Sequence, residues 1–186
     1  MPALIIDIET CPVDIEHAKS LPDEEQTGLL NPIDSRIVAI GIRYNESIIL
    51  QDEEKRMLEA FWLKWRAFRK TGAPVVGFNI LSFDLPFLVA RSFINNVAIA
   101  PFTLKEIIDL REKLSAYRYG KTRGKLKEYA ELIGLKTLDI DGSDIMQLCI
   151  DNDQEKIGEY LRKDLEITEA LYNRAEALNI TKISRW

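Results

Sequence analysis

The amino-acid sequence predicts an α/β protein in which helices cover both faces of a mixed sheet. Three observations lead to this class. Short apolar runs in the first half of the chain are rich in isoleucine and valine and have the length of buried strands. Segments with helical spacing of apolar residues lie between and after these runs, and one pair of runs is separated only by a short polar turn, which predicts a hairpin. A chain of 186 residues suits one core, so we expect residues 1–186 to form a single domain.

Five segments are predicted to be strands, and the first is the clearest. Residues 3–9 form a nearly continuous apolar run, as expected of a strand that is buried on both faces. Residues 36–44 and 48–50 flank the polar turn of the hairpin. Residues 74–78 and a shorter segment at 107–110 complete the set, and the proline-containing segment between the first two strands is predicted to be a loop.

Helices are predicted over five segments. Residues 53–70 carry apolar and aromatic side chains at helical spacing, and these rings are expected to belong to the core rather than to a binding surface. Residues 86–95 have a proline in their first turn, where it is tolerated, and residues 125–133 precede a glycine that would end a helix. Two further helices are expected near residues 142–151 and 154–178.

The charge of the chain is unevenly distributed. The formal net charge is −5, which argues against a protein that coats nucleic acid through its overall charge. Residues 111–127, in contrast, contain seven basic residues and one acidic residue, a local net charge of +6. This basic stretch suits a local contact with phosphate groups, and a solvent-exposed loop followed by a helix would have the same composition.

Two further properties bear on the environment of the protein. No apolar run approaches the length of about 18 residues that a membrane-spanning helix needs, and the N-terminus lacks the features of a secretory signal, so we expect a cytoplasmic protein. Cys11 and Cys149 are the only cysteines and are far apart in the sequence. We therefore expect two buried free thiols rather than a disulfide or a structural zinc site.

Four acidic side chains are candidate ligands of divalent metal ions. Asp7 and Glu9 lie two residues apart at the end of the first predicted strand, so they point to the same face of the sheet. Mg²⁺ or Mn²⁺ would relieve their mutual repulsion and desolvation, because carboxylate oxygens are suitable ligands for these ions. Asp84 stands at a predicted loop-to-helix junction, and Tyr160 and Asp164 share one face of a predicted helix. Taken alone, each could instead be an exposed acid, a helix cap or a surface contact.

In their order along the chain, these segments resemble the motifs of the DEDD superfamily of 3′–5′ exonucleases. Asp7-Ile8-Glu9-Thr10 is similar to the D-x-E-T motif, Asn79 to Asp84 to the N-x-x-x-F-D motif, and Tyr160 to Asp164 to the Y-x-x-x-D motif. The tyrosine places the resemblance in the DEDDy branch, because the other branch has a histidine in the third motif and His17, the only histidine, precedes the second. The resemblance extends over essentially the whole chain, which looks most like the proofreading exonuclease domain of family-B DNA polymerases.

The resemblance implies a ribonuclease H-like, three-layer α/β/α fold with a mixed five-stranded sheet, in which the first strand is central and the hairpin lies beside it. It also implies a metal-dependent 3′–5′ exonuclease that hydrolyses phosphodiester bonds at the 3′ end of single-stranded DNA with two divalent ions, Mg²⁺ or Mn²⁺. The implied metal ligands are Asp7, Glu9, Asp84 and Asp164, and Tyr160 is the residue that would position the attacking water.

The resemblance further suggests contacts to the substrate and leaves alternatives open. The candidate substrate-binding residues are Thr10, Asn79, Phe83, Arg118, Lys121 and Arg123, with Phe83 alternatively a core residue. A 3′–5′ exoribonuclease would carry the same motifs, because none of them recognises a 2′-hydroxyl. A non-catalytic module that binds nucleic acid or docks a partner could also use this fold. The implied partners are the 3′ ends of single-stranded DNA or RNA and a polymerase or repair complex.

Overall fold

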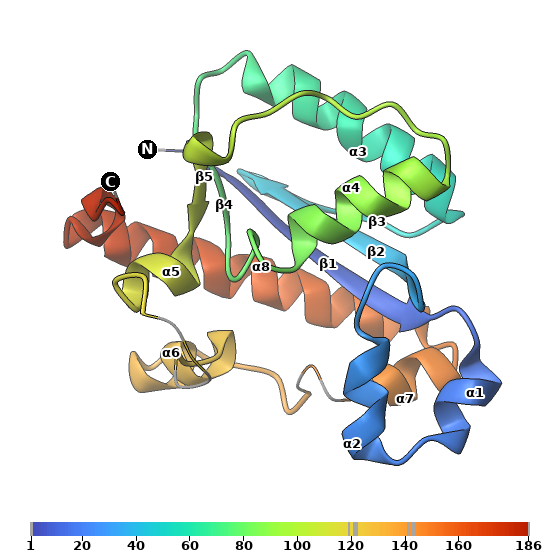
Figure 1. The fold of residues 1–186 in the computed structure, drawn as a ribbon. Helices are drawn as coiled ribbons and strands as arrows, with labels where there is room; N and C mark the ends of the chain where they lie inside the picture. The colour runs from blue at the N-terminus through green and yellow to red at the C-terminus, as the bar shows by residue number, and fades with distance from the viewer. Residues whose placement is uncertain (1, 119, 121–122, 141, 143, 186) are drawn as a thin grey trace.

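The computed structural model describes residues 2–118, 120, 123–140, 142 and 144–185 (Figure 1). Within these residues, five strands form one sheet in the order β3-β2-β1-β4-β5. The strands are β1 (Leu4–Pro12), β2 (Ser35–Tyr44), β3 (Glu46–Leu50), β4 (Val75–Gly77) and β5 (Ile107–Asp109). The central strand β1 pairs antiparallel with β2 and parallel with β4, so the sheet is mixed, as predicted. The hairpin of β2 and β3 lies beside it.

Two long helices cover one face of the sheet. α3 (Glu54–Arg69) and α4 (Asp84–Ile94) pack on the face formed by the even-numbered residues of β1 (Figure 1). The aromatic side chains of α3, including Trp62 and Trp65, are buried in this core, as expected from their helical spacing.

The opposite face of the sheet is covered by α8 (Gln154–Ala177), which packs on β1 and β2. On the same side lie α5 (Leu110–Leu114), α6 (Leu126–Leu132) and α7 (Ile145–Ile150) (Figure 1). The sheet therefore lies between two layers of helices, which confirms the predicted three-layer α/β/α fold. None of the helices in the described part of the chain is long and apolar enough to cross a membrane.

The prediction of a loop between β1 and β2 is wrong. This segment contains α1 (Ile15–Ser20), α2 (Asp23–Gln26) and the 3₁₀ turn η1 (Thr27–Leu29). α1 begins after Asp14, whose carboxylate accepts a hydrogen bond from the backbone N–H of His17 at 2.9 Å. Such short helices contain too few residues to show an apolar period, which is why the hydrophobic pattern does not reveal them.

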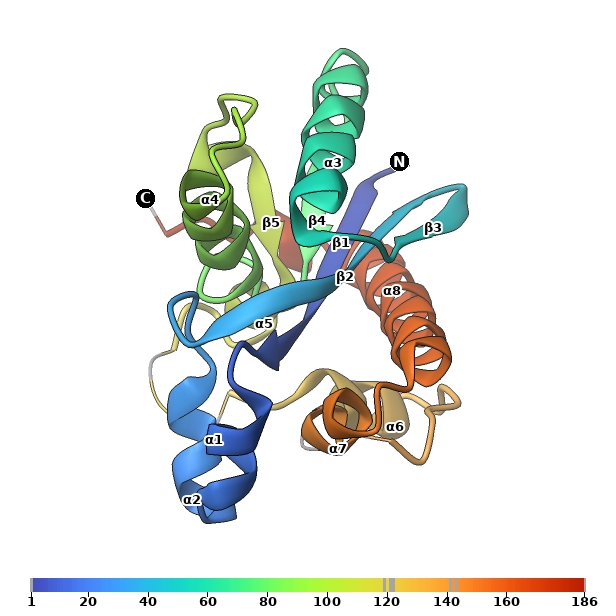
Figure 2. The same ribbon diagram turned by 90° about the vertical axis from the view of Figure 1, so that its right-hand side faces the viewer.

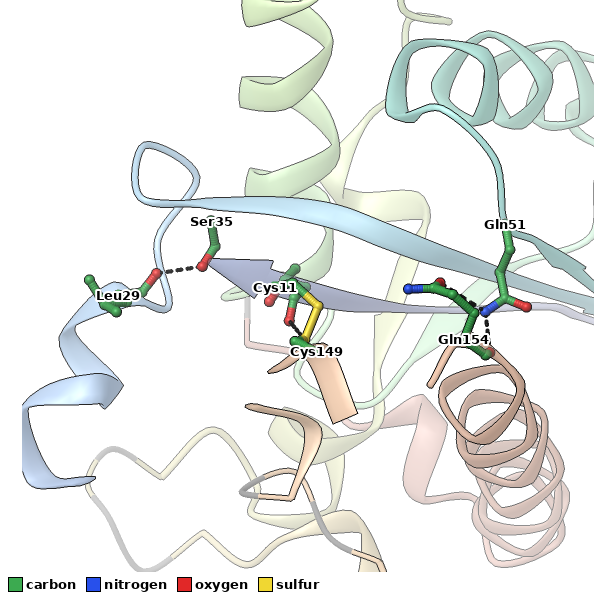
Figure 3. The surroundings of a disulfide bond; sticks show 7 residues. Cys11, Leu29, Ser35, Gln51, Cys149 and Gln154 are labelled. Carbon is green, nitrogen blue, oxygen red and sulfur yellow. Dashed lines mark hydrogen bonds between the residues drawn. A yellow bond between two sulfur atoms is a disulfide. The ribbon is translucent and has the colours of Figure 1, made fainter. Parts of the chain in front are cut away.

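A disulfide joins the end of β1 to α7, so the expectation of two free thiols is wrong (Figure 3). The Cα atoms of Cys11 and Cys149 are 5.8 Å apart, and both residues are buried in a cluster with Val38 and Leu161. The two cysteines are 138 residues apart in the sequence, and the packing of α7 against β1 brings them together. Cysteine spacing in a single sequence does not reveal a pairing that depends on this tertiary contact.

Reduction of the Cys11–Cys149 disulfide is expected to lower the free energy of unfolding by about 2–5 kcal/mol, because the bond restricts the unfolded chain over a long loop. Urea unfolding with and without a phosphine reductant measures the change. The double variant Cys11→Ser/Cys149→Ser is the control, and its unfolding midpoint should not respond to the reductant. A wild-type midpoint that is the same in both conditions would contradict the expectation.

Candidate active site

β1 carries two of the acids to the end of the sheet. Its residues alternate between the two faces, so Ile6 and Ile8 are buried toward α3 and α4 while Asp7 and Glu9 point toward α8. The pairing of β1 with β2 skips one residue of β2 between Glu9 and Thr10. Irregular pairing of this kind increases the local twist of a strand and changes the direction of the side chains that follow.

The short length of β4 allows Asp84 to reach β1. β4 pairs with β1 at only two positions and ends at Gly77. A Cβ atom at Gly77 would lie 2.7 Å from the Cβ of Ile80, so the chain can turn away at this point only because the residue is glycine. Beyond the end of β4, the N–H of Ile8 donates to Oδ1 of Asp84 at 3.1 Å. Asp84, the first residue of α4, is thereby buried against β1.

Tyr160 and Asp164 complete the cluster from α8. They lie one helical turn apart, so the Tyr160 hydroxyl and the Asp164 carboxylate are neighbours on one face of α8 and interact electrostatically. Carboxylate oxygens of Asp7, Glu9 and Asp164 lie within 4.8 Å of one another. The N–H of Ile8 also donates to Oδ1 of Asp7 at 3.1 Å, so the carboxyl groups of Asp7 and Asp84 share one donor and lie close together. The structure therefore brings together all four acids and the tyrosine that the sequence motifs contain.

Burial and mutual repulsion oppose the ionisation of this cluster. Desolvation, and then the charges of the other three acids, raises the pKa of Asp7 well above its usual value. Glu9 is affected in the same way, since burial and the neighbouring charges raise its pKa well above the usual range. Burial raises the pKa of Asp84 to about 7 and that of Asp164 to about 6, although the neighbouring Tyr160 hydroxyl and then Lys127 partly offset the rise at Asp164. A divalent cation would remove both penalties, so this set of carboxylate oxygens fits such an ion.

A cavity of about 700 Å³ opens beside the acids, and Glu9, Tyr160 and Asp164 lie in its wall. Figure 2 shows the two groups of helices that flank this end of the sheet, with α2 on one side and α6 and α7 on the other. Both groups contribute lining residues: Gln26, Thr27 and Leu30 from the first, and Lys125, Leu126, Lys127, Ile145, Met146 and Gln147 from the second. The cavity thus combines an acidic end with apolar walls and two lysines.

Only some of the predicted substrate-binding residues reach this cavity. Thr10 and Phe83 line it, and Phe83 also packs against Phe87, with the ring centroids 4.8 Å apart. Phe83 is therefore placed both to contact a ligand and to extend the core. Asn79 does not line the cavity, and its side-chain oxygen accepts a hydrogen bond from Nη1 of Arg111 at 3.2 Å.

The basic stretch contributes to the cavity through residues that the sequence motifs do not single out. Lys125 and Lys127, at the start of α6, line the cavity, whereas Arg118 and Arg123 do not. Lys121 lies outside the described residues. The relevant signal in the sequence is a pair of lysines at the beginning of a predicted helix, where the helix start holds their positions.

Two family models match the chain. Residues 13–130 match the family described as "DNA polymerase family B, exonuclease domain". Residues 102–182 match the family described as "Predicted 3'-5' exonuclease related to the exonuclease domain of PolB". The second acidic motif lies in the first range and the third motif in the second range, whereas Asp7 and Glu9 precede both.

Known proteins resemble the chain over most of its length. An uncharacterized protein of Methanocaldococcus jannaschii is 37% identical over 171 residues, which cover 83% of this chain and 93% of that protein. The structure of the family B DNA polymerase from the hyperthermophilic archaeon Pyrobaculum calidifontis matches with a TM-score of 0.71 and 17% identity. This match covers 97% of the chain and 25% of the polymerase, so the chain spans a quarter of that protein and shares its fold there.

Proposed function

The chain belongs to the exonuclease-domain family of the family-B DNA polymerases, and on this premise we propose that it is a metal-dependent 3′–5′ exonuclease acting on single-stranded DNA. The observation that supports this proposal most is the convergence of four acids and Tyr160 beside a cavity of about 700 Å³. Burial and repulsion penalise the charges of such a cluster, so it does not serve the stability of the metal-free protein.

The donor set supports two divalent ions, Mg²⁺ or Mn²⁺, as cofactors. Asp7, Glu9 and Asp164 would hold one ion, and Asp7 together with Asp84 would hold the other. Asp7 is suited to serve both, because it shares the N–H of Ile8 with Asp84 and one of its oxygens lies within 4.8 Å of an oxygen of each of the other two acids. Bound ions of this kind stabilise charge on a scissile phosphate and make a water nucleophilic at neutral pH.

Tyr160 would orient the attacking water. Its hydroxyl lies beside the Asp164 carboxylate, and both residues line the cavity. Burial and the neighbouring acids raise the pKa of Tyr160, so the phenol keeps its proton at neutral pH. The phenol can therefore donate to Asp164 and accept a hydrogen bond from a water, which would direct a lone pair of that water toward the phosphate.

Tyr160→Phe is expected to lower kcat by about 10- to 100-fold, because one hydrogen bond to a charged group is lost from the transition state. KM for single-stranded DNA should not change, and the loss should be smaller than that caused by removing a metal ligand. Steady-state degradation of a labelled oligonucleotide measures both constants. Tyr172→Phe, at a buried tyrosine of α8 that does not line the cavity, is the control. Equal activity of the two variants would exclude the role given to Tyr160.

The cavity is suited to the unpaired nucleotides at the end of a strand. Its volume of about 700 Å³ lies within the range of small-ligand sites. Phe83 offers a ring on which a base can stack, and Lys125 and Lys127 offer cations for backbone phosphates. Thr10, next to Glu9, lines the cavity and would contact the terminal nucleotide. These contacts tolerate different bases, as an exonuclease requires.

Labelled oligonucleotides test the proposed function. Single-stranded DNA and RNA of the same sequence, each labelled at the 5′ or the 3′ end, are incubated with the protein and Mg²⁺, Mn²⁺ or a chelator. A 3′–5′ exonuclease shortens 5′-labelled DNA to a descending ladder and releases the 3′ label as a mononucleotide, and the chelator stops both. A ladder from RNA alone would instead assign an exoribonuclease. No product from any substrate, together with no Mn²⁺ binding in calorimetry, would favour a module that docks a polymerase or repair complex.

A further inference from the structure

Two charged residues outside the acid cluster connect the turn before Asp84 to a wall of the cavity. They are Asp109, at the end of β5, and Arg111, in the first turn of α5. Neither residue lines the cavity, and the proposed mechanism does not use them. Arg111 is one of the cations of the basic stretch, for which composition alone suggests a contact with phosphate.

The carboxylate of Asp109 accepts hydrogen bonds from two backbone segments, the turn before Asp84 and the first turn of α5. Its Oδ1 accepts from the N–H of Asn79 at 3.0 Å, and its Oδ2 accepts from the N–H of Leu81 at 3.1 Å. Oδ1 also accepts from the N–H groups of Arg111 at 3.0 Å and Glu112 at 3.3 Å, which caps α5. Asp109 is only 2% exposed, so bulk water does not replace these bonds when the side chain is shortened. Both carboxylate oxygens are needed to make them.

The turn that Asp109 stabilises, residues 79–83, leads directly into α4 and therefore positions Asp84. Asn79 has a left-handed backbone with φ of 65°, and its carbonyl accepts from the N–H groups of Ser82 at 3.1 Å and Phe83 at 3.0 Å. α4 begins at the next residue, Asp84. A displacement of Asn79 would therefore move the Asp84 carboxylate relative to the other acids.

Arg111 ties the same turn to the start of α6. Its Nη1 donates to the side-chain oxygen of Asn79 at 3.2 Å, and its Nε donates to the carbonyl of Gly124 at 3.0 Å. Gly124 has a φ of 80°, a conformation that favours glycine. The ring of Tyr129 also leaves no space for a side chain there, because an added Cβ would lie 2.6 Å from the ring. Lys125 follows directly, so the arginine holds the lysine-bearing wall of the cavity against the turn.

We propose that Asp109 and Arg111 are positioning residues, which together set the placement of Asp84 relative to the cavity wall formed by Lys125 and Lys127. This inference rests on the proposed nuclease function, since it concerns a proposed metal ligand and a proposed strand-binding surface. A phosphate contact would need only the charge of Arg111, whereas the bridge between two acceptors needs the planar fork of the guanidinium. Conservative substitutions therefore distinguish the two roles.

Arg111→Lys keeps the charge and removes the fork. We expect kcat on single-stranded DNA to fall by about 10- to 100-fold, the usual effect of losing a residue that orients a metal ligand. Arg43→Lys is the matched control: Arg43 donates to both Glu169 and Ser47 at 2.9 Å, but it lies away from the cavity. This control should lose thermal stability and keep its kcat. Wild-type activity in Arg111→Lys, as a phosphate contact predicts, or equal losses of kcat in the two variants would overturn the inference.

Asp109→Ser tests the acid with a readout that does not depend on turnover. Serine still caps α5 but cannot reach both N–H groups of the turn. We expect calorimetry to show an affinity for Mn²⁺ that is about 10- to 100-fold weaker than in the wild-type protein. The same replacement at Asp153, which caps α8 by accepting from the N–H of Lys156 at 3.1 Å, should leave the affinity unchanged. If Asp109→Ser does not fold, Asp109→Asn, which retains one acceptor oxygen, takes its place.

The outcomes separate this inference from the function on which it rests. Wild-type affinity for Mn²⁺ in the Asp109 variants refutes the positioning role even when the wild-type protein degrades DNA. A wild-type protein that neither degrades DNA nor binds Mn²⁺ refutes the proposed function first and the inference with it. A selective loss of Mn²⁺ affinity in the Asp109 variants, together with a selective loss of kcat in Arg111→Lys, supports both.

Discussion

Asp7→Asn is expected to lose more than about a thousandfold in nuclease activity while the metal-free protein becomes more stable. Asp7 lies against the other three acids, so its neutral replacement removes a ligand that both ions would share. The same replacement removes one of four charges whose mutual repulsion and desolvation burden the folded state. Loss of activity with a gain in stability is the expected signature of a residue retained for chemistry rather than for folding.

Two measurements on purified Asp7→Asn check this expectation. Single-turnover degradation of 5′-labelled DNA reports the activity, and thermal unfolding in chelator at pH 8 reports the stability. We expect Tm to rise by roughly 2–4 °C, the shift that about 1 kcal/mol produces in a domain of this size. Asp52→Asn, at an exposed acid before α3, should change neither quantity. Full nuclease activity in Asp7→Asn would refute the assignment of the site.

Without metal, the protein is expected to become less stable as the pH rises from about 5.5 to about 8, and Mn²⁺ is expected to reverse this trend. Burial raises the pKa of Asp84 to about 7 and that of Asp164 to about 6. In the unfolded chain both groups titrate at about pH 4. A carboxyl group with a raised pKa holds its proton more tightly when folded, so its stabilising contribution is complete at low pH and is lost as the pH passes the folded value. The pKa values of Asp7 and Glu9 are raised as well and act in the same direction.

Thermal unfolding in EDTA and in Mn²⁺, at half-unit steps of pH, measures this effect. Tm in EDTA should fall by on the order of 5 °C over the interval, whereas in Mn²⁺ it should rise, because ionised carboxylates bind the ion more tightly. The interval begins above the range in which Glu54 titrates. Burial opposes ionisation there, but hydrogen bonds from Arg91 lower the pKa of Glu54, so it destabilises the protein only in more acidic solution. A Tm in EDTA that increases with pH would show that the four acids do not repel one another in a buried site.

Long periodic elements could be predicted from the sequence to within a few residues. The helix expected at 154–178 is α8 (Gln154–Ala177), and the strand expected at 36–44 is β2 (Ser35–Tyr44). α8 buries one regular apolar face, and β2 is buried on both faces over most of its length, and that burial determines their structure. α1 has no such face and depends on one capping carboxylate, so its sequence resembles that of a loop. The disulfide escapes prediction for a different reason, since it joins segments that only the completed fold brings together.

The acid cluster could be predicted only in part from the periods of its strand and helix. The strand period places Asp7 and Glu9 on one face, and the helix period does the same for Tyr160 and Asp164. Neither period says that the two faces meet, and only the order of the motifs, compared with a known family, suggests it. The approach of Asp84 depends on where β4 ends, and the support of its turn comes from a carboxylate about 30 residues further along the chain. Such tertiary contacts have no sequence period from which they could be predicted.

Because β4 ends early, the backbone N–H of Ile8 donates to a proposed metal ligand instead of to the neighbouring strand. On the edge of β1 that faces β4, the N–H of Leu4 donates to the carbonyl of Pro74 at 2.9 Å, whereas the N–H of Ile8 donates to Asp84. Extending β4 would offer Ile8 a carbonyl and expel the carboxylate from its place. A redesign that extends β4 along β1 should therefore give a more stable protein with an impaired metal site. Selection for catalysis would keep the hydrogen bonding between β1 and β4 incomplete.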